Sequence, residues 1–128
     1  MNIPGLRTYL LDRPGATEDR PFGPQPLVMK VGGKMFALLA EHDQPPRLSL
    51  KCDPAHAQFL RDEYPSVQPG YHLNKTHWNT VVLDSSVPEE ELRSMIDESY
   101  RLVVQSLTQV QRRALQNEAS QGTQKAGQ

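Results

Sequence analysis

The sequence has 128 residues, of which 37% are hydrophobic and 23% are charged, and its formal net charge is −1. A chain of this length is expected to fold as one domain around one core. The charge balance argues against a protein that coats nucleic acid by bulk attraction, because such proteins are usually strongly basic.

Cysteine content and hydropathy narrow the class of protein further. Cys52 is the only cysteine, which excludes an internal disulfide and a metal site made of four cysteines. The N-terminus lacks a basic segment followed by an apolar run, and no apolar stretch approaches the roughly 20 residues of a membrane span. We therefore expect a cytoplasmic protein with no membrane partner.

The first predicted element is a short helix, followed by an irregular connection. Leu6, Tyr9 and Leu10 recur at helical spacing, and Arg13-Pro14-Gly15 ends the pattern. Residues 14–26 contain four prolines and two glycines among polar residues, which predicts a connection without regular structure.

Three strands are predicted next. Leu27–Val31 and Met35–Ala40 are β-compatible apolar runs, and Gly32-Gly33 between them supplies the positive φ angles of a tight hairpin turn. The segment Arg47–Lys51 alternates between apolar and polar residues, which predicts a third strand with one solvated face.

A second helix and a second hairpin follow. Asp53-Pro54 has the form of an N-cap followed by proline in the first helical turn, and Pro65 ends the helix. Tyr71–Leu73 and Trp78–Leu83 flank the polar segment Asn74-Lys75-Thr76, which we interpret as two strands and their turn.

The last predicted helix is amphipathic. Its start is set either by a capping box between Ser86 and Glu89 or by Pro88 as the first helical residue. The apolar stripe at helical spacing, which is expected to pack on the sheet, consists of Leu92, Met95, Ile96, Ser99, Val103 and Leu107.

The composition changes after this helix. Residues 116–128 contain too little apolar material to offset the entropy of ordering, so we expect a disordered tail behind a domain of residues 1–115. The element order α-β-β-β-α-β-β-α predicts the α+β class.

The segment from Tyr71 to Thr80 is the candidate site, because aromatic, basic and amide side chains are concentrated in it. Lys75 at its tip can contact phosphate, Asn74 and Asn79 can form hydrogen bonds, and Trp78 can stack on a base. In the alternative interpretation, Trp78 belongs to the core and the asparagines form turn hydrogen bonds.

Cys52 raises a second possibility. Together with His56, or with His72 and His77, it suggests a thiol nucleophile or a metal site; the alternative is a small buried side chain. A nucleophile needs a base and an orienting group, and zinc needs three or four converging ligands, and neither set is evident in the sequence. We expect no catalytic residue, no metal and no cofactor.

Several motifs resemble the MmcQ/YjbR family over residues 3–110. They are Phe22-Gly23-Pro24, the stretch Lys30–Ala37, the run Leu50–Pro54, the segment Pro69–Val81, and the final helix with Asp97, Ser99 and Tyr100. The resemblance implies a two-layer α/β sandwich of the type shared with secretion chaperones, in which helices cover one face of an antiparallel sheet.

The resemblance also implies DNA binding through two projecting hairpin wings. On this sequence the wings correspond to Gly32-Gly33 and to Asn74-Lys75 with its flanking histidines. The candidate contact residues are Lys30, Lys34, Lys51, His72, Asn74, Lys75, His77, Trp78 and Asn79.

We therefore predict a DNA-binding module. The alternative is a protein-interaction or chaperone-like module that uses an uncovered sheet face or the last helix. We do not expect an enzyme, because no acid, base and nucleophile form a set. A monomer or a weak dimer is expected.

Overall fold

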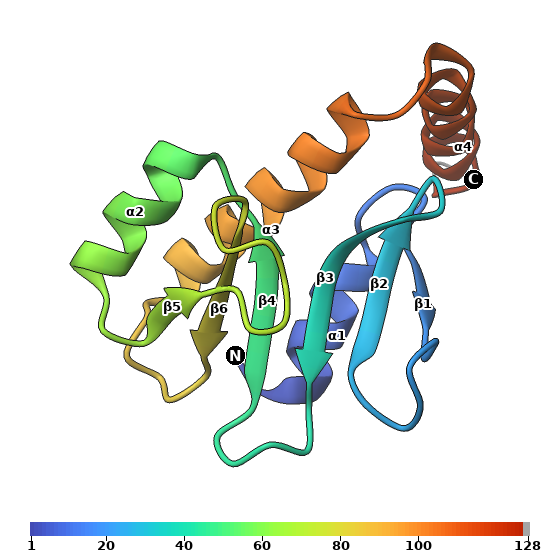
Figure 1. Cartoon of the computed structure of the whole chain (residues 1–128). Coiled ribbons are helices and arrows are strands. Elements are labelled where there is room, and N and C mark those ends of the chain that lie inside the picture. The colour runs from blue at the N-terminus through green and yellow to red at the C-terminus, as the bar shows by residue number, and fades with distance from the viewer. Residues whose placement is uncertain (127–128) are drawn as a thin grey trace.

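The structure is a computed structural model that describes the backbone of residues 1–126 and the side chains of residues 1–117. Four helices and six strands are present in these residues (Figure 1). In chain order they are α1 (Ile3–Leu11), β1 (Thr17–Asp19), β2 (Leu27–Val31), β3 (Lys34–Ala40), β4 (Arg47–Lys51), α2 (Pro54–Glu63), β5 (Val67–Pro69), β6 (Trp78–Val82), α3 (Glu89–Gln105) and α4 (Gln109–Ala126).

The six strands form one sheet in the order β1-β2-β3-β4-β6-β5, and every neighbouring pair is antiparallel. Helices α1 and α3 lie behind this sheet in Figure 1. The predicted α+β class, with helices covering one face of an antiparallel sheet, is therefore confirmed.

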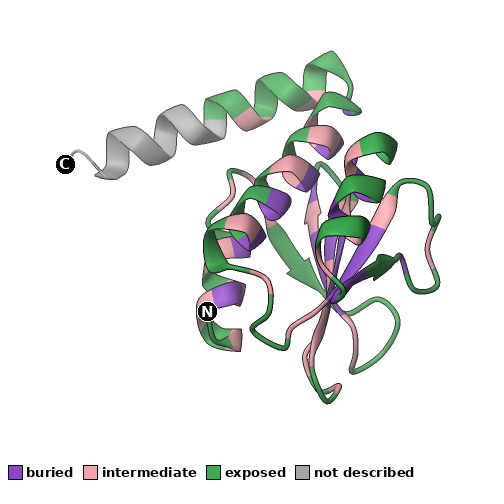
Figure 2. Cartoon of the chain, turned by 90° about the vertical axis from the view of Figure 1, so that its left-hand side faces the viewer, coloured by how far each residue is buried: buried purple, intermediate pink, exposed green. Residues whose placement is uncertain are grey.

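The core lies between the sheet and its helices. Leu6 and Leu10 of α1 and Ile96 of α3 are almost fully buried against apolar residues from the central strands. Figure 2 shows the buried residues of α3 on the side of that helix that faces the sheet. Burying each such side chain contributes about 1.5–3 kcal/mol, so this layer is the main source of stability.

The hairpin predicted around Gly32-Gly33 is confirmed, and it contains one irregularity. Met29 pairs with Ala37 and Lys30 pairs with Met35, so Phe36 is an extra residue in β3. This β-bulge interrupts the ladder between β2 and β3. The hydroxyl of Ser99 from α3 accepts a hydrogen bond from the Lys51 amide at 2.9 Å and donates one to the Phe36 carbonyl at 2.5 Å.

The start of α2 agrees with its sequence, whereas the predicted start of α3 needs correction. The Asp53 carboxylate accepts hydrogen bonds from the amides of Ala55 and His56, as an N-cap does. Helix α3 follows Pro88 without a side-chain cap, so the capping box between Ser86 and Glu89 is wrong. The Ser86 hydroxyl lies instead within hydrogen-bond distance of Asp84 and Ser66.

The strand predicted at Tyr71–Leu73 is also wrong. The hairpin partner of β6 is β5, which ends at Pro69, and residues 70–77 form the loop between the two strands. This loop has its own local structure: His72 has a φ of 58°, and the Asn74 side chain accepts hydrogen bonds from the amides of Thr76 and His77. Such an Asx turn competes with strand pairing.

Two further elements were not predicted. The connection over residues 14–26 contains the edge strand β1, and the segment expected to be a disordered tail from residue 116 is assigned to α4 as far as Ala126. Residues 127–128 of that predicted tail lie outside the described residues. Within the described part of the chain, no helix combines the length and the apolar character needed to cross a membrane.

Candidate nucleic-acid interface

The face of the sheet opposite α1 and α3 carries most of the predicted contact residues, and we call it the helix-free face. Alternation along the strands sets this placement: Met29 and Leu50 point into the core, so Lys30 and Lys51 point to the other side. On β6, Val81 belongs to the core, which turns Trp78 and Thr80 to the helix-free face. The strand register thus collects residues from three strands on one surface.

Two projections rise beside this surface. The first is the β2–β3 turn, where Gly32 and Gly33 have φ angles of 58° and 78°. The second is loop 70–77, which lies in front of β4 and β6 in Figure 1. Its ends are held together by a hydrogen bond from the Gly70 amide to the Trp78 carbonyl at 2.8 Å. The resemblance implied two hairpin wings. In the structure the first is a hairpin turn, and the second is a loop.

Arg61 ties loop 70–77 to α2. Its guanidinium donates hydrogen bonds to the Asn79 side-chain oxygen at 2.7 Å and to the carbonyls of Lys75 and Trp78. Sequence reasoning missed Arg61 because, within a helical pattern, it resembles any other solvated basic residue. The sequence shows only a basic residue in the last turn of a helix, and the strand β5 separates that helix from the loop.

Asn79 has an internal role and is corrected as a contact residue. Its side chain is 2% exposed, and its amide also donates to the Ala57 carbonyl at 3.3 Å. Because both ends of the amide are paired inside the protein, Asn79 joins β6 to α2. We leave it out of the interface.

The candidate lysines differ in how much of their charge is available. Lys30 forms an ion pair with Asp19 at 3.3 Å, which offsets its charge. Lys34 and Lys75 donate instead to the neutral carbonyls of Ser106 and Gly70. Lys51 has no side-chain partner among the described residues.

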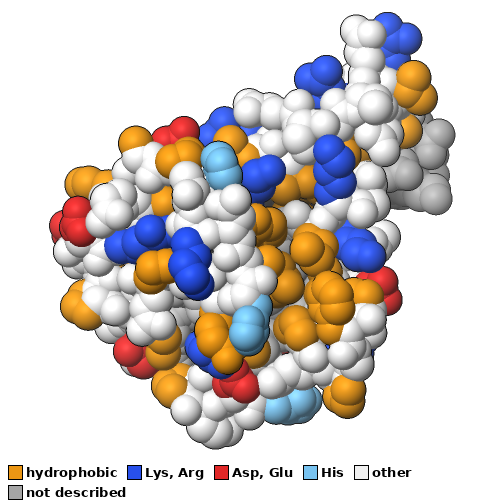
Figure 3. All heavy atoms as spheres, viewed as in Figure 1, with side chains coloured by type: hydrophobic (Ala, Val, Ile, Leu, Met, Phe, Trp, Pro, Cys, Tyr) orange, Lys and Arg blue, Asp and Glu red, His pale blue; other side chains and the backbone are white. Residues whose placement is uncertain are grey.

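Four cations thus lack a carboxylate partner within the described part of the chain. Lys51, Arg61 and Lys75 lie on or beside the helix-free face, and Lys34 lies at the β2–β3 turn with its ammonium directed to Ser106 at the end of α3. In Figure 3, basic side chains are spread over this face around an apolar centre, and acidic ones lie mostly near its outline. The acidic residues Glu89, Glu90 and Glu91 belong to the first turn of α3, behind the sheet. A chain with a formal net charge of −1 therefore has a local group of basic side chains without acidic partners.

Aromatic groups of loop 70–77 are also accessible. Tyr71 is 54% exposed, and its ring centroid lies 4.0 Å from that of His72. The Arg47 guanidinium carbon lies 4.5 Å from the Tyr71 ring centroid, and Arg47 is itself paired with Asp43 at 2.8 Å. Trp78 is half-buried, with its Cβ against Gly70, so the indole is only partly available for stacking.

A pocket of about 450 Å³ lies between loop 70–77 and the connection that precedes β2. Its apolar wall includes Phe22, Leu38 and Leu73. Ser49 and Thr80, whose hydroxyls are 2.8 Å apart, line it as well. The helix-free face is therefore hollowed at its apolar centre.

Of the histidines considered for Cys52, His56 approaches the thiol with its ring, whereas the contact with His77 is between backbone groups, the Cys52 amide and the His77 carbonyl at 2.8 Å. Cys52 Sγ lies 3.7 Å from His56 Nδ1 and donates to the Glu98 carboxylate at 2.9 Å. Burial, and then the Glu98 carboxylate, raise the pKa of the Cys52 thiol far above its ordinary value. The protonated thiol is a poor nucleophile.

Comparisons with known proteins agree with this fold. The YjbR family model matches residues 11–102. The chain is 36% identical to YjbR of Escherichia coli K12 over 115 residues, which cover 90% of this chain and 98% of that protein. It is 44% identical to YbdF of Escherichia coli O157:H7 over 87 residues, covering 68% of this chain and 71% of that protein.

A solved structure is similar over most of the chain. The crystal structure of protein DR2400 from Deinococcus radiodurans, a DUF419 domain, superposes with a TM-score of 0.84 at 42% sequence identity. The match covers 89% of this chain and 87% of the other. The family model, the relatives and the shared fold together lead to one conclusion: the chain is a member of the YjbR family.

Proposed function

We propose that this protein is a nucleic-acid-binding module whose helix-free face contacts the phosphate backbone. The observation that carries the proposal is that Lys51, Arg61 and Lys75, on or beside that face, have no carboxylate partner among the described side chains, with Lys34 at the neighbouring turn. Each ammonium or guanidinium that replaces a counterion on DNA contributes to affinity, and this contribution weakens as salt concentration rises.

The position of each candidate residue on the fold suggests whether it contacts a phosphate or a base. Lys34 and Lys75 on the two projections contact phosphates on either side of the sheet, and Lys51 contacts one between them. Tyr71, His72 and Asn74 on loop 70–77 lie close to the bases. His77, the last residue of the same loop, offers a ring nitrogen for a further contact with the nucleic acid.

The test is a titration of labelled duplex and single-stranded DNA with the full chain at low salt. Lys51→Ala and Lys75→Ala are expected to weaken binding. Each substitution should also reduce the magnitude of the slope of log affinity against log salt concentration by about 0.9 on duplex DNA. Arg101→Ala, which removes an exposed cation from α3, is the matched control and should leave both quantities unchanged. Absent binding, or equal losses in all three variants, contradicts the proposal.

One observation favours a second candidate, a protein-interaction module. The pocket of about 450 Å³ on the helix-free face is lined mainly by apolar side chains, which suits a side chain of a partner protein. Recovery of a stoichiometric protein partner free of nucleic acid, together with loss of that partner in Leu38→Asp, would favour this candidate. We propose for either module a monomer or weak dimer and no enzymatic activity.

A further inference from the structure

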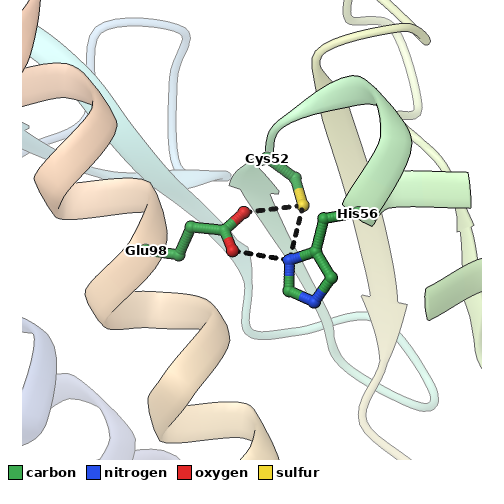
Figure 4. Close-up of side chains that lie close together, drawn as sticks. All are labelled: Cys52, His56 and Glu98. Carbon is green, nitrogen blue, oxygen red and sulfur yellow. Dashed lines mark hydrogen bonds and ion pairs between the residues drawn. The ribbon is translucent and has the colours of Figure 1, made fainter. Parts of the chain in front are cut away.

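Three potential metal ligands converge directly after the end of β4, and none of them is a residue assigned to phosphate binding. Cys52 follows β4, His56 lies in the first turn of α2, and Glu98 projects from α3 (Figure 4). The Glu98 carboxylate lies 2.9 Å from Cys52 Sγ and 2.5 Å from His56 Nδ1. One ligand atom from each residue lies within 4.8 Å of the other two.

The local structure fixes this convergence. Asp53 caps α2, so the chain turns directly from Cys52 into the helix that carries His56. Ser99 next to Glu98 accepts a hydrogen bond from the Lys51 amide, which holds α3 against the end of β4. The three side chains are thereby anchored by backbone contacts that do not depend on the cluster itself.

The spacing suits a zinc ion. Zinc bonds of about 2.3 Å to sulfur and 2.0–2.1 Å to nitrogen in a tetrahedron place these two ligand atoms roughly 3.5 Å apart. Cys52 Sγ and His56 Nδ1 are separated by 3.7 Å. The Glu98 oxygens lie close to both atoms, so a small side-chain rotation brings one of them to the remaining ligand position.

The charges of the three side chains and their exposure to solvent also suit a divalent cation. A thiolate, a carboxylate and a neutral imidazole together balance two positive charges. Cys52 is 5% exposed, whereas the side chains of His56 and Glu98 are 37% and 16% exposed, so the group is open on one side. That opening gives an ion a path to the ligands and gives a water molecule access to a fourth position.

We propose that Cys52, His56 and Glu98 bind one Zn²⁺-class transition-metal ion, with a water molecule as the fourth ligand. On binding, the Cys52 thiol releases its proton to solvent and forms the sulfur–metal bond. His56 binds through the Nδ1 lone pair, with its proton on Nε2, and Glu98 exchanges its hydrogen bonds for a metal–oxygen bond. None of the three ligands is a proposed DNA contact.

The test uses the untagged full chain, freed of metal with a chelator and titrated with Co²⁺ and then with Zn²⁺. Because Cys52 is the only cysteine, a thiolate-to-cobalt charge-transfer band can arise only from this site. We expect one Co²⁺ per chain with that band, displacement by Zn²⁺, and a rise in Tm with Zn²⁺ concentration.

Single-ligand variants locate the ion. Cys52→Ser removes the band, and His56→Gln and Glu98→Gln weaken metal binding by more than about 10-fold, since loss of even a supporting partner costs about 10–100-fold. His42→Gln is the matched control, because the His42 ring is exposed and lies 3.7 Å from Glu41, and this variant should bind metal as the wild-type chain does.

Circular dichroism checks that each variant is folded. If Glu98→Gln does not fold, Cys52→Ser and His56→Gln decide the question by the band and by the zinc-dependent Tm. The proposal is overturned if the wild-type chain shows no charge-transfer band, or if Cys52→Ser and His56→Gln bind Zn²⁺ with unchanged affinity. The cluster would then be a hydrogen-bonded part of the fold only.

Discussion

The hydroxyl of Ser99 on α3 donates a hydrogen bond to the backbone carbonyl of Phe36 at 2.5 Å, and Phe36 is the bulged residue of β3. The same hydroxyl accepts a hydrogen bond from the Lys51 amide on β4. Ser99 is fully buried. One side chain therefore bridges β3 and β4 next to the last pair of their ladder, Ala37 and Leu50, and it joins α3 to both strands.

Replacing Ser99 with alanine should lower the free energy of unfolding by about 1–3 kcal/mol, because it leaves a buried carbonyl and amide without this partner. Urea unfolding monitored by circular dichroism measures the change. Ser94→Ala on the exposed side of the same helix is the control and should change stability by less than about 0.5 kcal/mol. Equal effects of the two substitutions would show that the hydroxyl bridge contributes little.

The two glycines of the β2–β3 turn should respond differently to alanine. Both have positive φ angles, which cost an alanine roughly 1–2 kcal/mol. A Cβ on Gly32 would also lie 2.7 Å from Leu107 Cδ2, whereas a Cβ on Gly33 meets nothing within 4 Å. We expect Gly32→Ala to lower Tm more than Gly33→Ala, measured by thermal unfolding. The reverse order would contradict the close contact between the turn and Leu107.

Arg61→Ala should loosen loop 70–77. The substitution removes the donors to the carbonyls of Lys75 and Trp78 and leaves the buried oxygen of Asn79 without its partner. We expect a loss of about 1–3 kcal/mol in stability and faster hydrogen exchange at the loop amides. Arg101→Ala removes the same charge from an exposed site, and it should leave exchange in the loop unchanged. Unaltered exchange in Arg61→Ala would rule out the tether.

Acid should destabilise the fold through Glu41. A hydrogen bond from Arg20 at 2.6 Å lowers the pKa of the Glu41 carboxyl below its usual value. The folded state then binds a proton less readily than the unfolded state, so the stabilisation is complete above the unfolded pKa of about 4.3 and is lost as pH falls through the folded pKa.

Urea unfolding between pH 7 and pH 3 tests this dependence. Glu41→Gln removes the titrating group, so its stability should fall less steeply with acid than that of the original chain. Asp43, whose pKa is lowered by its hydrogen bonds with Arg47 and Gln25, retains part of the dependence in this variant. Identical pH profiles for the two proteins would exclude Glu41 as a contributor.

Local signals in the sequence predicted much of the fold. Gly32-Gly33, the Asp53 cap and the apolar stripe of α3 are each encoded within a few residues, and each is confirmed. Strand β1 could not be found in this way, because all its residues are exposed and polar and its conformation depends on pairing with β2. The strand predicted at Tyr71–Leu73 failed because alternation does not reveal that Asn74 closes a turn with its side chain.

The candidate sites were harder to predict than the elements, since they depend on contacts between distant parts of the chain. Lys51 could be assigned to the solvated face of its strand from alternation alone. Glu98 is 46 residues from Cys52 and 42 from His56, so no local spacing indicates that it completes the cluster. Asn79 has the residue type of a base-reading side chain, but only the position of α2 shows that its amide is already paired.

The outermost strands of the sheet limit how this protein can associate with others. Strands β1 and β5 have three residues each, β1 carries Glu18 and Asp19, and β5 ends at Pro69, which lacks a backbone donor. Short, charged or proline-containing borders resist the addition of a foreign strand. Both edge strands therefore disfavour aggregation by pairing with strands of other molecules. Other molecules are expected to bind to the faces of the protein instead.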